Sequence, residues 1–303
     1  MKVVVPADAP TELLGPLPDG VEIVREPSPD AELLVLGFEP PPPLEALPAL
    51  RVIQTPSAGV EWLLPFVPEG ITICNGSGIH DTPVAEWVVA MILALRRRLP
   101  EFCELQRRGR WEGDVNEGTA TGPSPLGSID DLERATVLVL GHGSIGRALE
   151  ARLAPFGART VGVARHARPG VEPLERVPEL LPEADVVVLL LPLTAETEGL
   201  VDAAFLARMP DGALLVNAAR GKLVDTGALE RELRAGRLRA ALDVTDPEPL
   251  PPDHSLWSAP GVLITPHVAG SVSALQARSY RFAGDQIRRY AAGEPLLNVR
   301  TDY

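Results

Sequence analysis

The sequence contains only two cysteines, Cys74 and Cys103. Two thiols are too few for the disulfide framework that stabilises many small secreted proteins. The low count therefore favours a reducing compartment, and we expect both cysteines to be small buried core residues.

Long apolar runs and excess positive charge are also missing. The longest apolar run, around ADVVVLLLPL, is far shorter than the roughly 20 residues that a membrane-spanning helix requires. The N-terminal stretch MKVVVPADAP is too short for a secretion signal and predicts a first strand. The formal net charge of −13 argues against binding to phosphate backbones or anionic membranes. We therefore expect a soluble, cytoplasmic protein without nucleic-acid or membrane partners.

The chain has 303 residues, 45% of them hydrophobic, which is enough for two domains with sizeable cores. In its first third, short β-branched runs alternate with helical signals and with Pro, Gly and Asp, predicting a small α/β domain with a parallel sheet. These runs are KVVVPA, VEIVRE, AELLVLGF, LRVIQT and ITICNG. A long helix is predicted over VAEWVVAMILALRRR, and the Gly-, Ser- and Pro-rich residues 111–130 predict a loop at a domain transition.

Six more apolar runs follow, most of them separated by helical stretches. They are ATVLVLG, RTVGVAR, DVVVLLLP, GALLVNAA, LRAALDVT and GVLITPH. Continuous apolar strands that alternate with helices predict a doubly wound parallel sheet that is buried on both faces.

A glycine-rich loop, VLVLGHGSIG, joins the first of these strands to a predicted helix. In such a loop Gly141 permits the tight turn, Gly143 lets a pyrophosphate approach the backbone, and Gly146 lets the helix pack close to the sheet. The helix N-terminus then offers N–H groups to the phosphates. A glycine turn without a ligand is the alternative.

Polar residues stand where three later strands are predicted to end. Asn217 and Arg220 follow one strand, Asp243 and Glu248 the next, and His267 the last. Ligands bind at the carboxyl ends of strands in open α/β sheets, so we expect Arg220, Glu248 and His267 to converge. Arginine can hold a carboxylate or carbonyl oxygen, and histidine can exchange a proton near neutral pH. A neighbouring carboxylate would orient the histidine ring and stabilise its protonated form.

Each of these three residues has a plainer alternative when it is taken singly. Arg220 could form a surface ion pair, Glu248 could be a solvated loop carboxylate, and His267 could be a hydrogen-bonded histidine at a strand end. Their occurrence together, in this order, is much more specific for a catalytic site.

Several motifs carry a resemblance to a known family. They are GHGSIG, LPLTAETEGLV, VNAARGKLVDTGALERELRAG, ALDVTDPEPLP and TPHVAG. Over nearly its full length the chain resembles the D-isomer-specific 2-hydroxyacid dehydrogenases. Upstream, QTPSAGVEWL and NGSGIHDTPVAEWVVAMILALRR are similar to the substrate loop and the interdomain helix of that family.

The resemblance implies two domains. A discontinuous, flavodoxin-like substrate domain would comprise residues 1–98 and 271–303, and residues 99–270 would form a Rossmann dinucleotide-binding domain. The family usually forms homodimers through the dinucleotide-binding domain. No metal site is expected.

The resemblance also implies roles for individual residues. Arg220, Glu248 and His267 match the catalytic set, with His267 giving a proton to the substrate carbonyl while hydride passes between the nicotinamide and C2 of a 2-oxo acid. The backbone near Ala58 and Gly59 matches the loop that receives the substrate carboxylate, where Arg220 also acts. The residues expected to contact the cofactor are Gly141, Gly143, Ser144, Ile145, Gly146, Ala164, Arg165, Arg168, Pro192, Thr197, Ala218, Ala219, Arg220, Asp243, His267 and Gly270.

The stretch TVGVARHARPG bears on the choice of cofactor. Where NAD-binding members of the fold carry an acidic residue at the end of the second strand, this sequence has Ala164 followed by Arg165. Ala164 removes the repulsion that a carboxylate would exert on a 2′-phosphate, and Arg165 and Arg168 can pair with that phosphate. The pattern resembles NADP-using members and predicts NADP as the preferred cofactor, with NAD possible. A solvated basic loop is the alternative, and His166 is expected to be a bystander.

The substrate is expected to be a small 2-oxo acid, with glyoxylate and hydroxypyruvate favoured. The substrate loop QTPSAGVEWL lacks cations and carries Glu61, which argues against a phosphorylated substrate. D-3-phosphoglycerate, D-lactate and phosphite-type dehydrogenases stay as enzymatic alternatives. A dinucleotide-sensing, corepressor-like binding protein is the alternative of another class.

Overall fold

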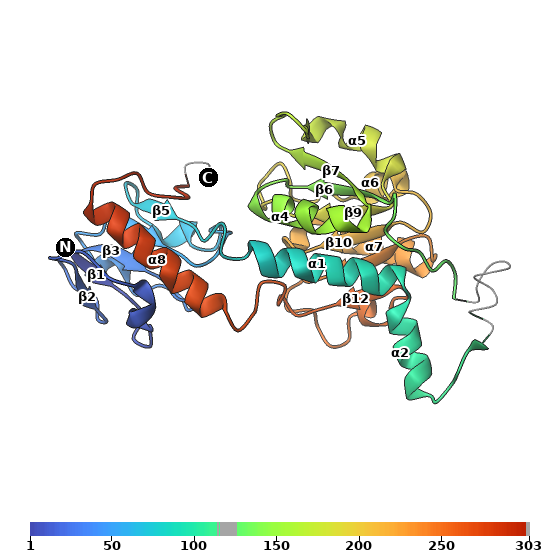
Figure 1. Cartoon of the computed structure of the whole chain (residues 1–303), viewed down its shortest axis with the longest axis horizontal. Coiled ribbons are helices and arrows are strands. Elements are labelled where there is room, and N and C mark those ends of the chain that lie inside the picture. The colour runs from blue at the N-terminus through green and yellow to red at the C-terminus, as the bar shows by residue number, and fades with distance from the viewer. Residues whose placement is uncertain (114, 116–125, 301–303) are drawn as a thin grey trace. The chain divides into compact units, whose positions relative to one another are not determined.

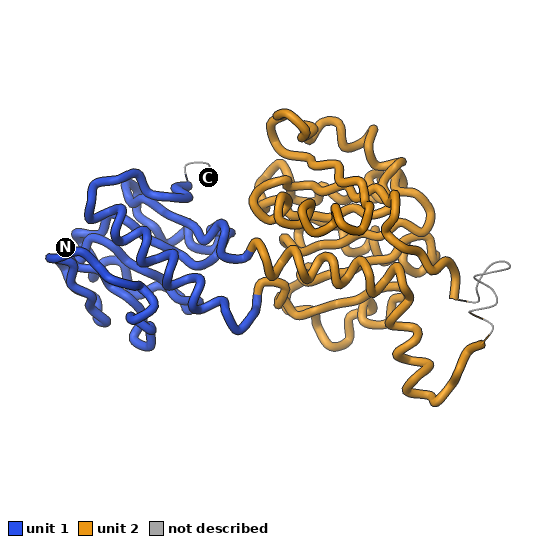
Figure 2. Tube along the Cα trace, viewed as in Figure 1, with its two compact units in different colours: residues 1–80, 271–303 blue, residues 81–270 orange. Residues whose placement is uncertain are grey.

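The computed structural model describes residues 1–113, 115 and 126–300, and the chain divides into two compact units. Unit 1 consists of residues 1–80 together with the C-terminal segment from Ser271, and unit 2 consists of Asp81–Gly270 (Figure 2). Residues 114 and 116–125, in the segment predicted to be a loop, lie outside the described residues.

The first boundary lies earlier than the predicted end of the substrate domain at residue 98. Helix α1 (Asp81–Arg96) belongs to unit 2 because its apolar face, including Val84, Val88 and Ile92, is buried in the core of that unit. The chain crosses between the units again after Gly270. The assignment of substrate and cofactor to the two units stays a prediction.

Unit 1 is built on a five-stranded parallel sheet with the order β2-β1-β3-β4-β5, which is the flavodoxin-like order (Figure 1). All five predicted strands are therefore confirmed. Their bounds are Lys2–Val4 (β1), Glu22–Val24 (β2), Ala31–Val35 (β3), Val52–Gln54 (β4) and Thr72–Cys74 (β5).

The connections in unit 1 differ from the predicted helical stretches. Residues 1–80 are all described, and between them the chain forms only short 3-10 helices, η1 (Thr11–Leu14), η2 (Leu44–Ala46) and η3 (Leu64–Phe66). A proline stands two residues after the end of each, at Pro16, Pro48 and Pro68, and proline cannot continue a helix. Helix α8 (Leu275–Ala291) from the C-terminal segment covers one face of the sheet instead.

Unit 2 contains a seven-stranded parallel sheet with the order β12-β11-β10-β9-β6-β7-β8. Renumbered from β6, this is the Rossmann order 3-2-1-4-5-6 with one further strand, so the predicted doubly wound sheet is confirmed. The short strand β8 was not predicted. The bounds are Thr136–Leu140 (β6), Arg159–Ala164 (β7), Val171–Pro173 (β8), Val186–Leu189 (β9), Leu214–Asn217 (β10), Arg239–Leu242 (β11) and Val262–Ile264 (β12).

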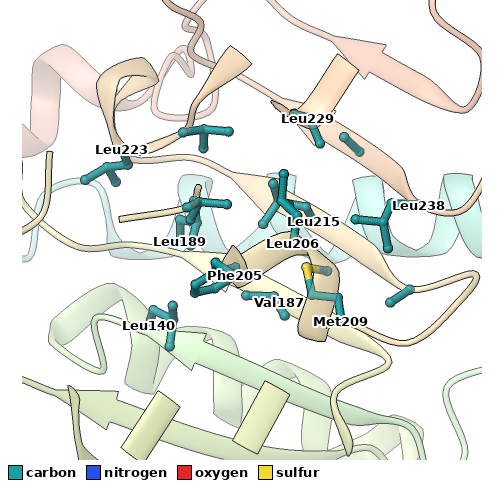
Figure 3. Packing of buried hydrophobic residues seen from close by; sticks show 14 of the residues in the cluster. Leu140, Val187, Leu189, Phe205, Leu206, Met209, Leu215, Leu223, Leu229 and Leu238 are labelled. Carbon is teal, nitrogen blue, oxygen red and sulfur yellow. The ribbon is translucent and has the colours of Figure 1, made fainter. Parts of the chain in front are cut away.

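Helices cover both faces of this sheet. On one face Val187, Leu189 and Leu215 pack against Phe205 and Leu206, as Figure 3 shows. On the other face the alternate residues of the same strands pack against α1 and α4. Further α-helices of unit 2 are α2 (Leu99–Arg107), α4 (Ser144–Leu153), α5 (Val177–Leu180), α6 (Ala203–Arg208) and α7 (Thr226–Arg234), and its 3-10 helices include η4 (Ala154–Phe156), η5 (Leu174–Arg176), η6 (Leu181–Glu183), η7 (Gly221–Leu223) and η8 (Ser255–Ser258).

The two cysteines have opposite surroundings. Cys74 on β5 is fully buried, and burial raises the pKa of its thiol to about 11. Cys103 is exposed, so the prediction of a core residue is wrong there, because α2 buries none of its side chains.

In the part of the chain that the structure describes, every helix is too short or too polar to cross a bilayer. The cytoplasmic location stays a prediction.

Candidate active site

The carboxyl edge of the unit 2 sheet carries the predicted catalytic residues. Arg220 lies in the loop after β10, Glu248 in the loop after β11, and His267 in the loop after β12. Strands β10, β11 and β12 are parallel neighbours, so the three loops leave the sheet at the same edge.

His267 and Glu248 are in direct contact. The ring nitrogen Nδ1 of His267 lies 2.7 Å from Oε1 of Glu248, and both side chains are about half exposed. A carboxylate at Nδ1 accepts the proton of that nitrogen and fixes the ring orientation. The second ring nitrogen, Nε2, is then the atom that can exchange a proton with a substrate.

The backbone of His267 is held in an unusual conformation. Its φ of 54° lies in the left-handed region, which few non-glycine residues adopt. The buried carboxylate of Asp243 accepts hydrogen bonds from the N–H groups of Val268 and Ala269, at 2.8 Å each, and from the Thr265 hydroxyl at 2.5 Å. The carbonyl of Asp243 accepts the N–H of His267 at 2.8 Å. Asp243 therefore fixes the turn that presents the histidine.

Arg220 is positioned by a second turn. The side chain of Asn217 accepts the N–H of Ala219 at 3.0 Å and donates to the Arg220 carbonyl at 2.9 Å. One guanidinium nitrogen of Arg220 donates to the Ala219 carbonyl at 2.7 Å. A Cβ atom on Gly221 would lie 1.9 Å from the Thr245 carbonyl oxygen, so this loop is pressed against the loop after β11. Asn217 and Asp243, on adjacent strand ends, thus hold the loops that carry Arg220 and His267.

The glycine loop fits the pyrophosphate of a dinucleotide. Gly141 has a φ of 102°, and a Cβ atom there would lie 2.5 Å from the Leu190 backbone, so only glycine fits. Gly143 caps the N-terminus of α4, and a Cβ atom on it would meet nothing within 4 Å. A side chain at Gly143 would therefore project into open space at the helix N-terminus, where phosphates bind. Ser144, Ile145 and Gly146 form the first turn of α4.

The residues predicted to select the cofactor flank the glycine loop. Ala164 is the last residue of β7, which lies between β6 and β8 in the sheet. Arg165 forms an ion pair with Glu196, and a guanidinium nitrogen of Arg168 donates to the carbonyl of His142 in the glycine loop. The basic loop is therefore tied to the glycine loop through Arg168 and to the loop after β9 through Arg165.

The loop after β9 is closed by Thr197, whose side chain is buried. Its hydroxyl donates to the Pro192 carbonyl at 2.7 Å and accepts the N–H of Thr194 at 2.8 Å. Pro192 and Thr197, both predicted to contact the cofactor, thus belong to one compact turn. Ala218, Ala219 and Gly270, also in the predicted set, lie in the loops after β10 and β12.

The predicted substrate loop lies after β4 in unit 1. The Ala58 carbonyl accepts a hydrogen bond from Asn75 at 2.6 Å, and the Gly59 carbonyl accepts one from the Trp62 indole at 3.2 Å. Among the residues that the structure describes, no acceptor pairs with the N–H groups of Ala58 and Gly59. Adjacent N–H groups without an acceptor suit a carboxylate.

Comparisons with known proteins decide the family. The model of the D-isomer specific 2-hydroxyacid dehydrogenase NAD binding domain matches residues 89–269. A glyoxylate reductase from Thermofilum pendens is 34% identical over 262 residues, which are 83% of this chain and 75% of that protein. The human glyoxylate reductase/hydroxypyruvate reductase is 33% identical over 258 residues, which are 82% of this chain and 76% of that protein.

A solved structure agrees over the whole chain. The D-isomer specific 2-hydroxyacid dehydrogenase from Xanthobacter autotrophicus Py2, in complex with NADPH and MES, superposes with a TM-score of 0.82 at 30% identity. The match covers 99% of this chain and 98% of that structure. This chain belongs to the D-isomer specific 2-hydroxyacid dehydrogenase family.

Membership in this dehydrogenase family confirms the predicted fold and the binding of a nicotinamide dinucleotide. It also confirms the prediction of an NAD(P)-dependent oxidoreductase at the level of the family. The roles of individual residues stay predictions.

Sequence reasoning gave no role to two residues of this dehydrogenase that the geometry singles out. Asn217 was noticed at a strand end, but its bonds to the Arg220 turn were not foreseen. Its position three residues before Arg220, at the end of a strand, is a signal for a side-chain-stabilised turn. Thr265, which bonds Asp243, carried no comparable signal.

Proposed function

We propose that this dehydrogenase uses NADPH to reduce a small 2-oxo acid to the 2-hydroxy acid, such as glyoxylate to glycolate or hydroxypyruvate to D-glycerate. One observation carries the proposal: the hydrogen-bonded pair of His267 and Glu248 stands on the same sheet edge as a glycine loop that is open at Gly143. Groups suited to proton transfer and to dinucleotide binding therefore lie at the same edge of the same sheet. The named activities of the Thermofilum and human relatives support the substrate class.

The bound nicotinamide would supply the hydride for C2 of the substrate. His267 would hold a proton on Nε2 and give it to the carbonyl oxygen, while Glu248 keeps the ring oriented through Nδ1. Arg220 would polarise the same oxygen and hold the carboxylate, since its planar guanidinium can donate two parallel hydrogen bonds. The N–H groups of Ala58 and Gly59 are proposed to bind the substrate carboxylate.

The proposed preference for NADPH depends on the end of β7. Ala164 places no carboxylate where a 2′-phosphate would lie, Arg165 follows it directly, and Arg168 stands three residues further along the same loop. Charge-assisted hydrogen bonds from arginine to phosphate are each worth about 1.5–3 kcal/mol. The Xanthobacter relative, solved with NADPH, supports the same preference.

The test is to follow NADPH absorbance with a panel of 2-oxo acids, repeated with NADH. We expect turnover with glyoxylate and hydroxypyruvate, a lower KM for NADPH than for NADH, and D-glycerate as the product from hydroxypyruvate. A lower KM for NADH would overturn the cofactor preference. A flat trace with every acid, together with tight cofactor binding, would favour the dinucleotide-sensing alternative.

We also propose a homodimer formed through unit 2. Helix α2 has no buried side chain and points away from the sheet of its unit (Figure 1). Beside it lies a groove of about 1220 Å³, lined by Leu99, Phe102, Leu105 and Trp111 among others. Trp111 is 96% exposed and Leu99 is 49% exposed. Exposed apolar side chains gathered in one groove mark an association surface, and we assign it to a second copy of the chain.

Light scattering after size exclusion tests the homodimer. We expect a dimer for the wild type and a monomer for Trp111→Glu, which puts a charge in the groove. Trp257→Glu is the matched control, because Trp257 is half exposed in the same unit but does not line the groove. A monomeric wild type, or a dimer that survives Trp111→Glu, would contradict the assignment.

A further inference from the structure

Arg165, which is proposed to pair with the 2′-phosphate, already has an acidic neighbour. Its Nη2 atom lies 3.7 Å from Oε1 of Glu196, and the two side chains are 69% and 66% exposed. The separation is longer than a hydrogen bond, so the pair is a loose electrostatic contact that another anion can displace.

Glu196 is held at this position by its own loop. The hydroxyl of Thr194 donates to Oε2 of Glu196 at 2.8 Å, and the buried Thr197 closes the turn on the other side. The hydrogen bond from Thr194 is the main reason that the pKa of Glu196 lies below its usual value, and the charge of Arg165 adds to the effect. Glu196 therefore presents a fixed negative charge to Arg165.

We propose that Glu196 is a specificity-determining residue that moderates the preference for the 2′-phosphorylated cofactor. This inference rests on the proposed use of NADPH. A dinucleotide with a 2′-phosphate must draw Arg165 away from Glu196 and brings its own negative charge close to that carboxylate. A dinucleotide with a free 2′-hydroxyl does neither, because Glu196 continues to neutralise Arg165.

Arg168 gives the basic loop a second cation that Glu196 does not contact. Its guanidinium donates to the carbonyl of His142 in the glycine loop, whereas Arg165 is the partner of Glu196. A 2′-phosphate could therefore still be attracted by Arg168 while Arg165 is partly neutralised. The arrangement predicts a graded preference between NADPH and NADH rather than an absolute one.

The experiment measures binding of 2′,5′-ADP and of 5′-ADP by calorimetry, so it does not depend on turnover. In Glu196→Gln we expect the affinity for 2′,5′-ADP to rise about three- to tenfold, while the affinity for 5′-ADP changes less than about twofold. Glu198→Gln is the matched control: it removes the same charge from an exposed position two residues along the same loop. It should leave both affinities within about twofold of wild type, since Glu198 is not the partner of Arg165.

The same substitution in an Arg165→Gln variant shows whether the effect of Glu196→Gln depends on Arg165. In Arg165→Gln the additional change Glu196→Gln should raise 2′,5′-ADP affinity by less than half as much, because there is no arginine to release. The same gain in both backgrounds, or no gain from Glu196→Gln alone, would overturn the inference. The ratio of the 2′,5′-ADP and 5′-ADP affinities of the wild type tests the proposed cofactor preference separately. Tighter binding of 5′-ADP would refute that preference, independently of the result for Glu196→Gln.

Discussion

The two units share an architecture but differ in what they place at the carboxyl edges of their sheets. Unit 1 has a cavity of about 660 Å³ near the ends of β1, β3 and β4, and Val5, Leu36 and Phe38 are among its mostly apolar lining residues. The corresponding edge of unit 2 carries Asp243 and His267, with polar partners for each. Both parallel sheets therefore have a carboxyl edge at which a site can form. The residues at the strand ends determine whether that edge carries groups that can exchange protons.

The largest expected effect comes from removing the proton donor of unit 2. His267→Ala should lower kcat by about 10²–10⁴-fold, the usual contribution of a positioned general acid, while the dissociation constant of NADPH stays within about threefold. Steady-state kinetics and fluorescence titration check the two parts. The control is His166→Ala, an exposed histidine after β7, which should keep wild-type turnover. Near-normal turnover in His267→Ala would remove the proposed catalytic role.

One glycine substitution in each unit allows the effects of overpacking in the two units to be compared. A Cβ atom at Gly221 would lie 1.9 Å from the Thr245 carbonyl oxygen in unit 2, and one at Gly284 would lie 1.9 Å from the Leu14 carbonyl oxygen in unit 1. Each change to Ala should lower the free energy of unfolding by about 1–3 kcal/mol or more through overpacking. Calorimetry would show the loss.

A control substitution and a measurement of function distinguish the effects of Gly221→Ala and Gly284→Ala. Gly227→Ala, within α7, meets only ordinary contacts and should be neutral or stabilising. Gly221→Ala should also raise the KM for the 2-oxo acid because it displaces the Arg220 turn, whereas Gly284→Ala should keep the affinity for NADPH. A loss of NADPH affinity in Gly284→Ala would contradict this separation of the two units.

A smaller effect is expected at the glycine loop of unit 2. Gly143→Ala adds a methyl group where nothing lies within 4 Å, and φ is negative at −84°, so thermal unfolding should shift only slightly although the ψ of −146° lies outside the usual β range. The affinity for NADPH should fall about tenfold, or about 1.4 kcal/mol, because the methyl group would meet the pyrophosphate. Gly113→Ala, another open position, should leave this affinity unchanged. Unchanged NADPH affinity in Gly143→Ala would contradict the proposed binding of the pyrophosphate at the glycine loop.

The smallest effect is expected from modifying the thiol of unit 2. A thiol reagent at pH 8 should label exposed Cys103 rapidly and leave turnover unchanged, while Cys74 of unit 1 stays protected. Burial holds the pKa of Cys74 at about 11, above the value of about 8.5 for a free cysteine. The unfolded chain therefore releases this proton first, so stability should fall as the pH rises from about 8.5 toward 11. Rapid labelling of Cys74 in the native protein would contradict its burial.

The sequence carries enough information for most strands and for the catalytic pair. Apolar runs and the order of the strand ends predicted where His267 and Glu248 would stand. Strand β8 was missed because VEP is short and ends in proline. The unit that contains α1 could not be predicted, because the sequence of an apolar helix does not say which core receives it. The bonds from Asp243 to Val268 and Ala269 depend on a turn that exists only once the sheet has formed.

The division of unit 1 between the two ends of the chain has a consequence for its synthesis on the ribosome. Unit 2 is continuous and is complete once Gly270 has left the exit tunnel. The strands of unit 1 emerge first, yet α8, which supplies Tyr280, Ala283 and Ile287 to their core, is among the last segments to be translated. The sheet that is made first must therefore wait, with one apolar face uncovered, while the whole of unit 2 is produced. Translation order thus leaves the oldest part of the nascent chain as the last to be finished.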